Sequence, residues 1–150
     1  MNQADLADAA IVHQEAFPRQ TNSYQWLECN LKATPRYLLY VAEINQQIIG
    51  YIIWVQKSGF RPEAVMELEQ LAVRADSQGQ GIGRQLIIHS LERVRKQLAS
   101  QNSVLKHVIV TTRADNHAQE LYKTTLGAEV EAVISNLYSA DEVMMIARDI

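Results

Sequence analysis

The sequence predicts a mixed α/β fold in which helices surround one central sheet, within a single domain over residues 1–150. Two observations predict it. Segments with apolar residues at three- and four-residue spacing alternate with segments rich in β-branched and aromatic residues. No internal repeat and no Pro/Gly/Ser-rich linker divides the chain. The expected order is two helices, three strands, a helix, a strand, a helix and two strands.

The first half of the chain supplies two helices and a hairpin. Residues 5–16 carry apolar side chains at helical spacing, and a second helix is expected over 23–33 with Ser23 as its N-cap. Strands are expected over 37–43 and 47–56, because both are rich in β-branched and aromatic residues. Their short connection favours an antiparallel hairpin.

The second half completes the sheet and its cover. A third strand is expected over 65–73, and a helix over 81–98 whose apolar stripe packs on the sheet. The nearly continuous apolar centre of 106–112 predicts an interior strand. The remaining elements are a helix over 116–126 closed by Gly127 at its C′ position, and strands over 129–137 and 143–148.

Composition excludes several function classes. Lys plus Arg is 14 and Asp plus Glu is 17, so the net charge is 14 − 17 = −3, without the basic footprint of a nucleic-acid binder. The single cysteine, Cys29, excludes a disulfide framework or Cys-rich zinc site and is expected to be a small core residue. The histidines lack metal-ligand spacing, so no metal is expected. No apolar stretch is long enough to cross a membrane, and residues 1–10 do not resemble a secretory signal, so the expected location is cytoplasmic.

A glycine-rich turn is the most informative segment. Three of the six glycines lie within 79–83, between an expected strand and an expected helix. Main-chain N–H groups and the positive end of a helix dipole bind phosphate oxygens well, and glycine lets the ligand come close. A dinucleotide fingerprint is rejected because Arg84 stands where its third glycine belongs, and no P-loop lysine is present. The alternative is a merely flexible connection.

The glycine-rich turn belongs to the first of two motifs. Leu71-Ala72-Val73 ends the third strand, and after four residues Gln78-Gly79-Gln80-Gly81-Ile82-Gly83 opens the next helix. The second motif consists of Asn116, Ala118, Tyr122 and Gly127. Together the two motifs resemble the GNAT superfamily of acyl-CoA-dependent N-acyltransferases. The resemblance covers roughly residues 5–148. It implies a mostly antiparallel sheet, splayed near the third strand and the 106–112 strand. The strand that usually precedes the family's first helix has almost no room here.

The resemblance also implies a cofactor site for acetyl-CoA, as co-substrate. The main chain of Leu71, Ala72 and Val73 would pair with the pantetheine arm, which Asn116 would also contact, and Tyr122 would lie beside the thioester sulfur. The turn would hold the pyrophosphate through Gln78, Gly79, Gln80, Gly81, Ile82, Gly83 and Arg84.

Acyl transfer to an amine needs a base for the ammonium proton, a donor for the oxyanion and an acid for the leaving thiolate. Glu67 and Glu69 lie two residues apart on the expected strand, so both face the same side, and either could be the base. Tyr122 is the candidate acid, and a backbone N–H near Val73 the candidate oxyanion donor. For the side chains the alternatives are surface ion pairing and core packing.

The expected function is transfer of an acetyl group from acetyl-CoA to a primary amine by direct attack. Two glutamates make the acceptor side acidic, which favours a cationic small amine, a lysine or a peptide N-terminus. A threonine at 111 and 112 replaces the carboxylate of ribosomal-protein alanine acetyltransferases, which weakens the peptide interpretation. The alternative function is a non-catalytic acyl-CoA-binding module. The sequence leaves a homodimer open and names no particular acceptor.

Overall fold

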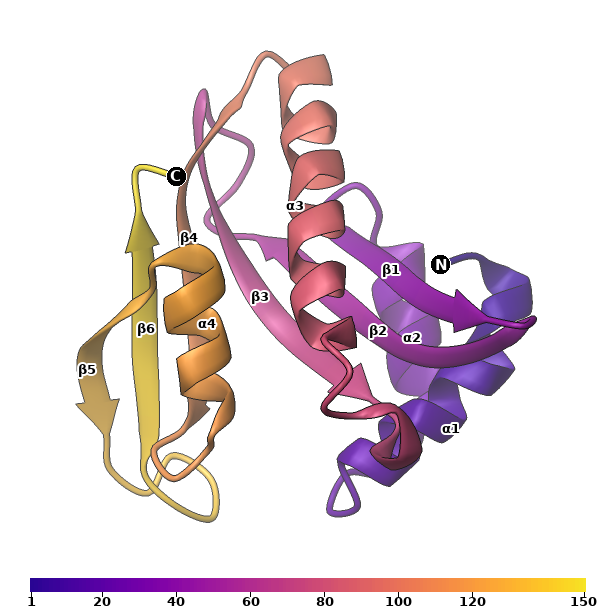
Figure 1. Ribbon diagram of the computed structural model, residues 1–150. Helices are drawn as coiled ribbons and strands as arrows, with labels where there is room; N and C mark the ends of the chain where they lie inside the picture. Colours follow the sequence, from indigo (N-terminus) through magenta and orange to yellow (C-terminus); the bar gives the residue numbers. More distant parts are fainter. The chain divides into compact units, whose positions relative to one another are not determined.

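A computed structural model describes all residues from Met1 to Ile150 (Figure 1). The expected order of helices and strands is confirmed. The helices are α1 (Leu6–Ala16), α2 (Ser23–Lys32), α3 (Ile82–Ser100) and α4 (Ala118–Leu126), with short 3-10 turns at Gln3–Asp5 and Ala75–Ser77. The strands are β1 (Tyr37–Ile44), β2 (Gln47–Gln56), β3 (Glu63–Val73), β4 (Val104–Arg113), β5 (Glu129–Ile134) and β6 (Glu142–Arg148).

The six strands form one sheet in the order β1-β2-β3-β4-β6-β5, so β4 is an interior strand as predicted. β3 pairs with β4 in parallel, whereas β6 pairs antiparallel with both β4 and β5. The β3–β4 register ends at Glu67 opposite Ile109, although β3 continues to Val73 and β4 to Arg113. The two strands are therefore no longer paired beyond Glu67 and Ile109, as expected for a sheet that splays between β3 and β4. No strand precedes α1, because residues 3–5 form a 3-10 turn.

Local signals explain most element boundaries. The hairpin between β1 and β2 turns at Asn45 and Gln46, which both have positive φ, and Gly127 closes α4 in the left-handed conformation. The N-cap prediction for Ser23 was wrong, because Asn22 occupies that position and Ser23 is the first helical residue. Cys29 is exposed, so its expected core role was also wrong.

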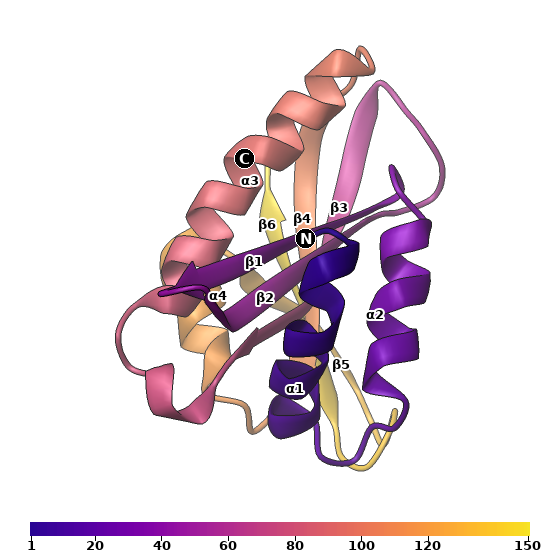
Figure 2. The ribbon, with the colours of Figure 1, turned by 90° about the vertical axis from the view of Figure 1, so that its right-hand side faces the viewer.

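The chain forms two compact units, and the first contains residues 1–54 and 70–92. Its core joins α1 and α2 to one face of β1 and β2, through residues such as Leu6, Leu27 and Ile53. Figure 2 shows the two helices side by side over these strands. α3 also contacts β2: near the end of the strand, Trp54 Nε1 donates a hydrogen bond to Ser90 Oγ of the helix at 2.8 Å.

Gly50 marks a close approach between β2 and the end of β3. A Cβ placed on it would lie 2.8 Å from the Ala72 carbonyl oxygen and 3.2 Å from Leu86 Cδ1. We expect Gly50→Ala to lower the free energy of unfolding by about 1–3 kcal/mol, as overpacking does, although alanine normally stabilises a strand relative to glycine. Urea unfolding measures this. Ala72→Gly should not restore stability, because the obstructing atom belongs to the main chain; restoration, or a more stable Gly50→Ala, contradicts the prediction.

The second unit contains residues 55–69 and 93–150. In it, α4 packs against β4, and Tyr122 and Leu126 are its buried residues. β5 is almost wholly exposed at the sheet edge. Across the whole chain, no helix combines the length and apolar character that spanning a membrane requires.

Candidate functional site: a glycine turn and a strand with two glutamates

The turn between β3 and α3 lies in the first unit and needs its glycines. Gly79 and Gly81 have φ values of 74° and 79°, in the left-handed region, and nothing lies within 4 Å of a Cβ placed on either. Two glutamine side chains brace the turn: Gln78 Nε2 donates to the Val73 carbonyl at 3.0 Å, and Gln80 Nε2 to the Asp76 carbonyl at 3.4 Å. These hydrogen bonds hold the conformation of the turn, while the space beside Gly79 and Gly81 stays open.

The turn ends at the N-terminus of a long helix. Gln85 N donates to the Gly81 carbonyl at 3.0 Å, so the N–H groups of residues 82–84 precede the first intrahelical bond and have no acceptor in the helix. The first turn of α3 contains no acidic residue, and the basic Arg84 is exposed there. A cation at this end opposes the helix dipole, whereas an anion would satisfy both the dipole and Arg84. These residues can hold a phosphate group.

Leu71, Ala72 and Val73 end β3 just before this turn, also in the first unit. Arg74 follows these three residues, and its main-chain N–H donates a hydrogen bond to the Ile49 carbonyl of β2 at 2.8 Å. Its guanidinium lies 3.5 Å from Asp76 and 3.9 Å from Glu15. The start of the turn is thus tied to β2 and α1.

The two glutamates lie in the second unit and share a face of β3, as predicted. Even-numbered residues of the strand are buried from 64 to 72, while Glu67 and Glu69 are half-buried. Glu67 is ion-paired: Lys57 Nζ lies 2.8 Å from Glu67 Oε2, and Thr111 Oγ1 lies 3.5 Å from Oε1. Sequence reasoning missed Lys57, because the loop that brings it to β3 follows no periodic pattern.

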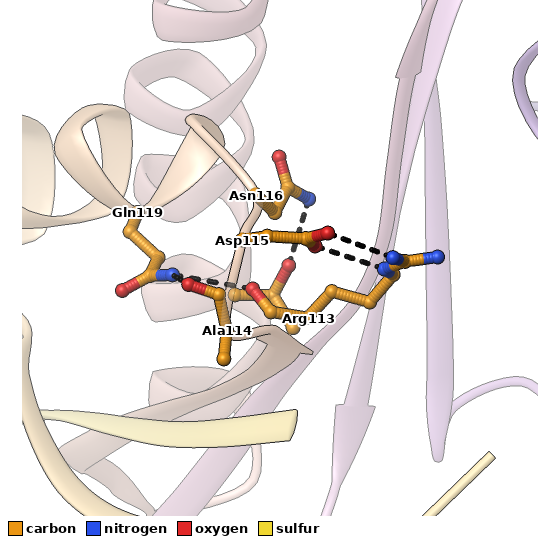
Figure 3. A network of polar contacts seen from close by, with 6 residues as sticks. Arg113, Ala114, Asp115, Asn116 and Gln119 are labelled. Carbon is orange, nitrogen blue, oxygen red and sulfur yellow. Dashed lines mark hydrogen bonds and ion pairs between the residues drawn. The ribbon is translucent and has the colours of Figure 1, made fainter. Parts of the chain in front are cut away.

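Asn116 is held at the start of α4 by a polar network (Figure 3). Its Nδ2 donates to Thr112 Oγ1 at 2.8 Å and its Oδ1 accepts the Ala118 N–H at 2.9 Å. Gln119 Nε2 donates to the Ala114 carbonyl at 2.9 Å, which tightens the same connection. The expected helix start at 116 is two residues early, because α4 begins at Ala118 and His117 is its N-cap.

Arg113, the last residue of β4, donates two hydrogen bonds of 2.9 and 2.8 Å to the carboxylate of Asp115, as Figure 3 shows. This pairing raises the pKa of Arg113 and lowers that of Asp115. Glu142 stands opposite Arg113 in the ladder with β6, and burial raises the pKa of its carboxyl. The Arg113 guanidinium is thus ion-paired with a carboxylate of the loop that directly follows β4.

Tyr122 is buried on α4, and burial raises the pKa of its hydroxyl to about 12. A phenol with this pKa is protonated throughout the neutral range. It can therefore donate a proton or a hydrogen bond to an anion, but it cannot act as a base there. No group of three or more metal-ligating side chains comes together in the chain.

Comparison with known proteins decides the family. The model of the acetyltransferase (GNAT) family matches residues 6–128, which include the turn, both glutamates, Asn116 and Tyr122. The chain belongs to the GNAT acetyltransferase family. No curated protein sequence matches it significantly.

Solved structures confirm the GNAT fold. The ribosomal-protein-S18-alanine N-acetyltransferase from Escherichia coli is 22% identical with a TM-score of 0.76, over 99% of this chain and 90% of that one. A putative GNAT acetyltransferase from Desulfovibrio desulfuricans is 18% identical with a TM-score of 0.79, over 99% and 95%. An aminoglycoside 6'-N-acetyltransferase complexed with coenzyme A is 16% identical with a TM-score of 0.78, over 99% and 93%. Identities this low establish the fold alone.

A buried polar network in the first unit of this GNAT chain escaped the sequence analysis. Gln70 Oε1 accepts hydrogen bonds from Trp26 Nε1 at 2.9 Å and from the Tyr51 hydroxyl at 3.0 Å. Gln70 Nε2 donates to Gln20 Oε1 at 3.3 Å, and His13 Nε2 lies 3.0 Å from that same oxygen. The network fastens the connection between α1 and α2 to β3. Its signal was present, since Gln70 is a polar residue in the buried phase of an alternating strand.

The network determines which tautomer of the neutral His13 ring fits its hydrogen-bond partners. An amide oxygen only accepts, so Nε2 carries the proton toward Gln20, and Nδ1 accepts from the Ser23 hydroxyl at 2.9 Å. Burial lowers the pKa of His13 below the ordinary 6.5, and the hydrogen bond with Gln20 offsets part of this effect. The neutral imidazole is therefore the form that the fold prefers.

Stability should consequently decrease as the pH falls below 6.5, the ordinary pKa of histidine. The unfolded chain then takes up a proton at this histidine while the folded chain resists, which favours unfolding. The stabilisation that neutral His13 gives to the folded state is complete above pH 6.5. It is lost as the pH falls toward the lower pKa that His13 has in the folded chain. We expect urea unfolding at pH 7.5 and 5.5 to show a smaller pH difference for His13→Gln than for wild type. His89→Gln, which changes an exposed histidine, should keep the wild-type difference; equal differences in all three proteins contradict the assignment.

Proposed function

We propose that this chain transfers the acetyl group of acetyl-CoA to a primary amine by direct attack. The observation that carries the proposal is the turn over 78–84, whose left-handed Gly79 and Gly81 open α3 within the region matched by the acetyltransferase family. The amides of residues 82–84, the helix dipole and Arg84 supply binding for the pyrophosphate of coenzyme A. The other residues of the turn, Gln78 and Gln80, shape it from within.

The remaining roles follow the family resemblance. The main chain of Leu71, Ala72 and Val73 pairs with the pantetheine amides, and an N–H near Val73 stabilises the oxyanion. Asn116 contacts the pantetheine arm with the hydrogen-bonding capacity that Thr112 and Ala118 leave, since an amide NH₂ has two donor hydrogens and its carbonyl two lone pairs.

In the reaction, a carboxylate of β3 takes a proton from the acceptor ammonium, directly or through a water. The amine nitrogen then attacks the thioester carbonyl carbon, the C–N bond forms, and the C–S bond breaks. The nitrogen releases its second proton to solvent, which leaves a neutral amide. Tyr122 donates its hydroxyl proton to the departing thiolate and regains one from solvent. Glu67 and Glu69 are both retained as candidates for the base, and Glu67 forms an ion pair with Lys57.

An acceptor screen with acetyl-CoA tests the function. Release of free thiol would be followed with phenethylamine, spermidine, kanamycin and a peptide with N-terminal alanine, and coenzyme A binding would be measured by calorimetry. Thiol release above hydrolysis with any amine supports the enzyme. Tight coenzyme A binding without turnover of any amine favours the non-catalytic module instead. A crystal structure of the complex in which the pyrophosphate lies away from residues 78–84 would overturn the cofactor assignment.

A further inference from the structure

Glu67 already holds an ammonium group. Its side chain is 13% exposed, and Lys57 Nζ lies 2.8 Å from Oε2. The other oxygen, Oε1, lies 3.5 Å from the Thr111 hydroxyl. A primary ammonium, that of Lys57, therefore already occupies this carboxylate.

Lys57 is anchored at its main chain, while its side chain reaches water. It directly follows β2, and its N–H donates to the Val65 carbonyl at 2.9 Å, so its backbone stays beside β3. Its side chain is 40% exposed. Because a lysine ammonium stands on a flexible four-carbon stem, it can leave Glu67 for water without any change in the loop.

The acceptor amine has the same chemistry as this lysine. An aliphatic amine is an ammonium ion at neutral pH, and it needs a carboxylate within hydrogen-bond distance to bind and to lose its proton. Two ammonium ions at one carboxylate oxygen repel each other, and Oε1 already faces Thr111. A cationic acceptor that takes the position at Glu67 Oε2 would therefore displace Lys57.

We propose that Lys57 is a specificity-determining residue, a built-in competitor that a cationic acceptor replaces at Glu67. The inference rests on the proposed function, because it treats Glu67 as the acceptor-binding carboxylate. It follows that Glu67 adds little net attraction for an ordinary monoamine, since one ammonium leaves as another arrives. An amine that is neutral in solution meets no such competition.

The test compares wild type with Lys57→Met, Lys57→Arg and Lys106→Met. Lys106 is a matched control, because its Nζ also lies 2.8 Å from a glutamate of β3, the exposed Glu63. The Kd of phenethylamine, a cation at pH 7, would be measured by NMR titration, and that of the neutral aniline beside it. We expect Lys57→Met to bind phenethylamine about 2- to 5-fold more tightly, the range of an ion pair of this exposure, with aniline unchanged.

Lys57→Arg keeps the competing charge and should retain the wild-type Kd for phenethylamine, as should Lys106→Met. The inference is overturned if Lys57→Met binds phenethylamine no more tightly than wild type, or if neither wild type nor Lys57→Met binds it. Lys57 would then only orient Glu67. A gain that aniline shares also overturns it. The thiol-release assay separates the two proposals: a wild type that acetylates amines while Lys57→Met leaves the phenethylamine Kd unchanged refutes the competitor alone. A wild type that acetylates none refutes the proposed function.

Discussion

Tyr122→Phe is expected to lower kcat by about 10²-fold or more while the Kd for coenzyme A stays within about twofold of wild type. Burial raises the pKa of the Tyr122 hydroxyl to about 12, so the wild-type side chain is a proton donor at every ordinary assay pH. Phenylalanine keeps the ring that fills this part of α4 and removes only the donor. The thiolate must then take its proton from water. Steady-state kinetics and calorimetry measure the two quantities.

Tyr138→Phe is the matched control, because it removes the same hydroxyl from a side chain that is 81% exposed. It should leave kcat unchanged. The raised pKa of Tyr122 adds a second expectation, that wild-type kcat shows no descending limb from this tyrosine below about pH 10. A Tyr122→Phe enzyme with kcat within about threefold of wild type would assign the hydroxyl to packing.

Local patterns predicted the elements of the fold well, because helices and strands bury their faces with fixed periods. β2 spans Gln47–Gln56, as expected from its β-branched run, and Gly127 has the positive φ of 70° that its C′ position requires. Helix and strand ends were less accurate: β4 begins at Val104, and β5 ends at Ile134. Pairing within the sheet determines these ends, and a strand partner far along the chain leaves no local signal.

For the candidate site, the sequence predicted backbone features better than side-chain partners. The clustered glycines predicted a special turn, and Gly79 and Gly81 have the left-handed conformation that explains them. The period of two placed Glu67 and Glu69 on one face of β3, which the burial pattern confirms. The pairing of Glu67 with Lys57 could not be predicted, since it depends on how the loop after β2 closes.

A polar residue in the buried phase of a strand is a sequence signal for a buried hydrogen-bond network. Gln70 interrupts the apolar phase of β3, and a polar group in that phase requires partners. It has Trp26, Tyr51 and Gln20. The requirement could have been stated from the alternation alone, although the identity of the partners depends on the packing of α1 and α2.

Gly81→Val is expected to weaken coenzyme A binding by at least about 10²-fold, because two or more charge-assisted hydrogen bonds from the turn would be lost. A β-branched residue is strained at the φ of 79° that Gly81 has, so the turn would change its conformation and turn its N–H groups away from the anion. The strain should cost about 1–3 kcal/mol of stability. Calorimetry with coenzyme A and thermal unfolding measure the two effects.

Gly59→Val provides the matched control for backbone strain. Gly59 has a φ of 86° and, like Gly81, nothing within 4 Å of a placed Cβ, but it lies in the loop between β2 and β3. The two variants should therefore lose similar stability, while only Gly81→Val loses coenzyme A. Equal losses of affinity would mean that general destabilisation weakens binding. Wild-type affinity in a folded Gly81→Val protein would mean that the glycine turn does not hold the pyrophosphate, and the proposed cofactor site would have to be abandoned.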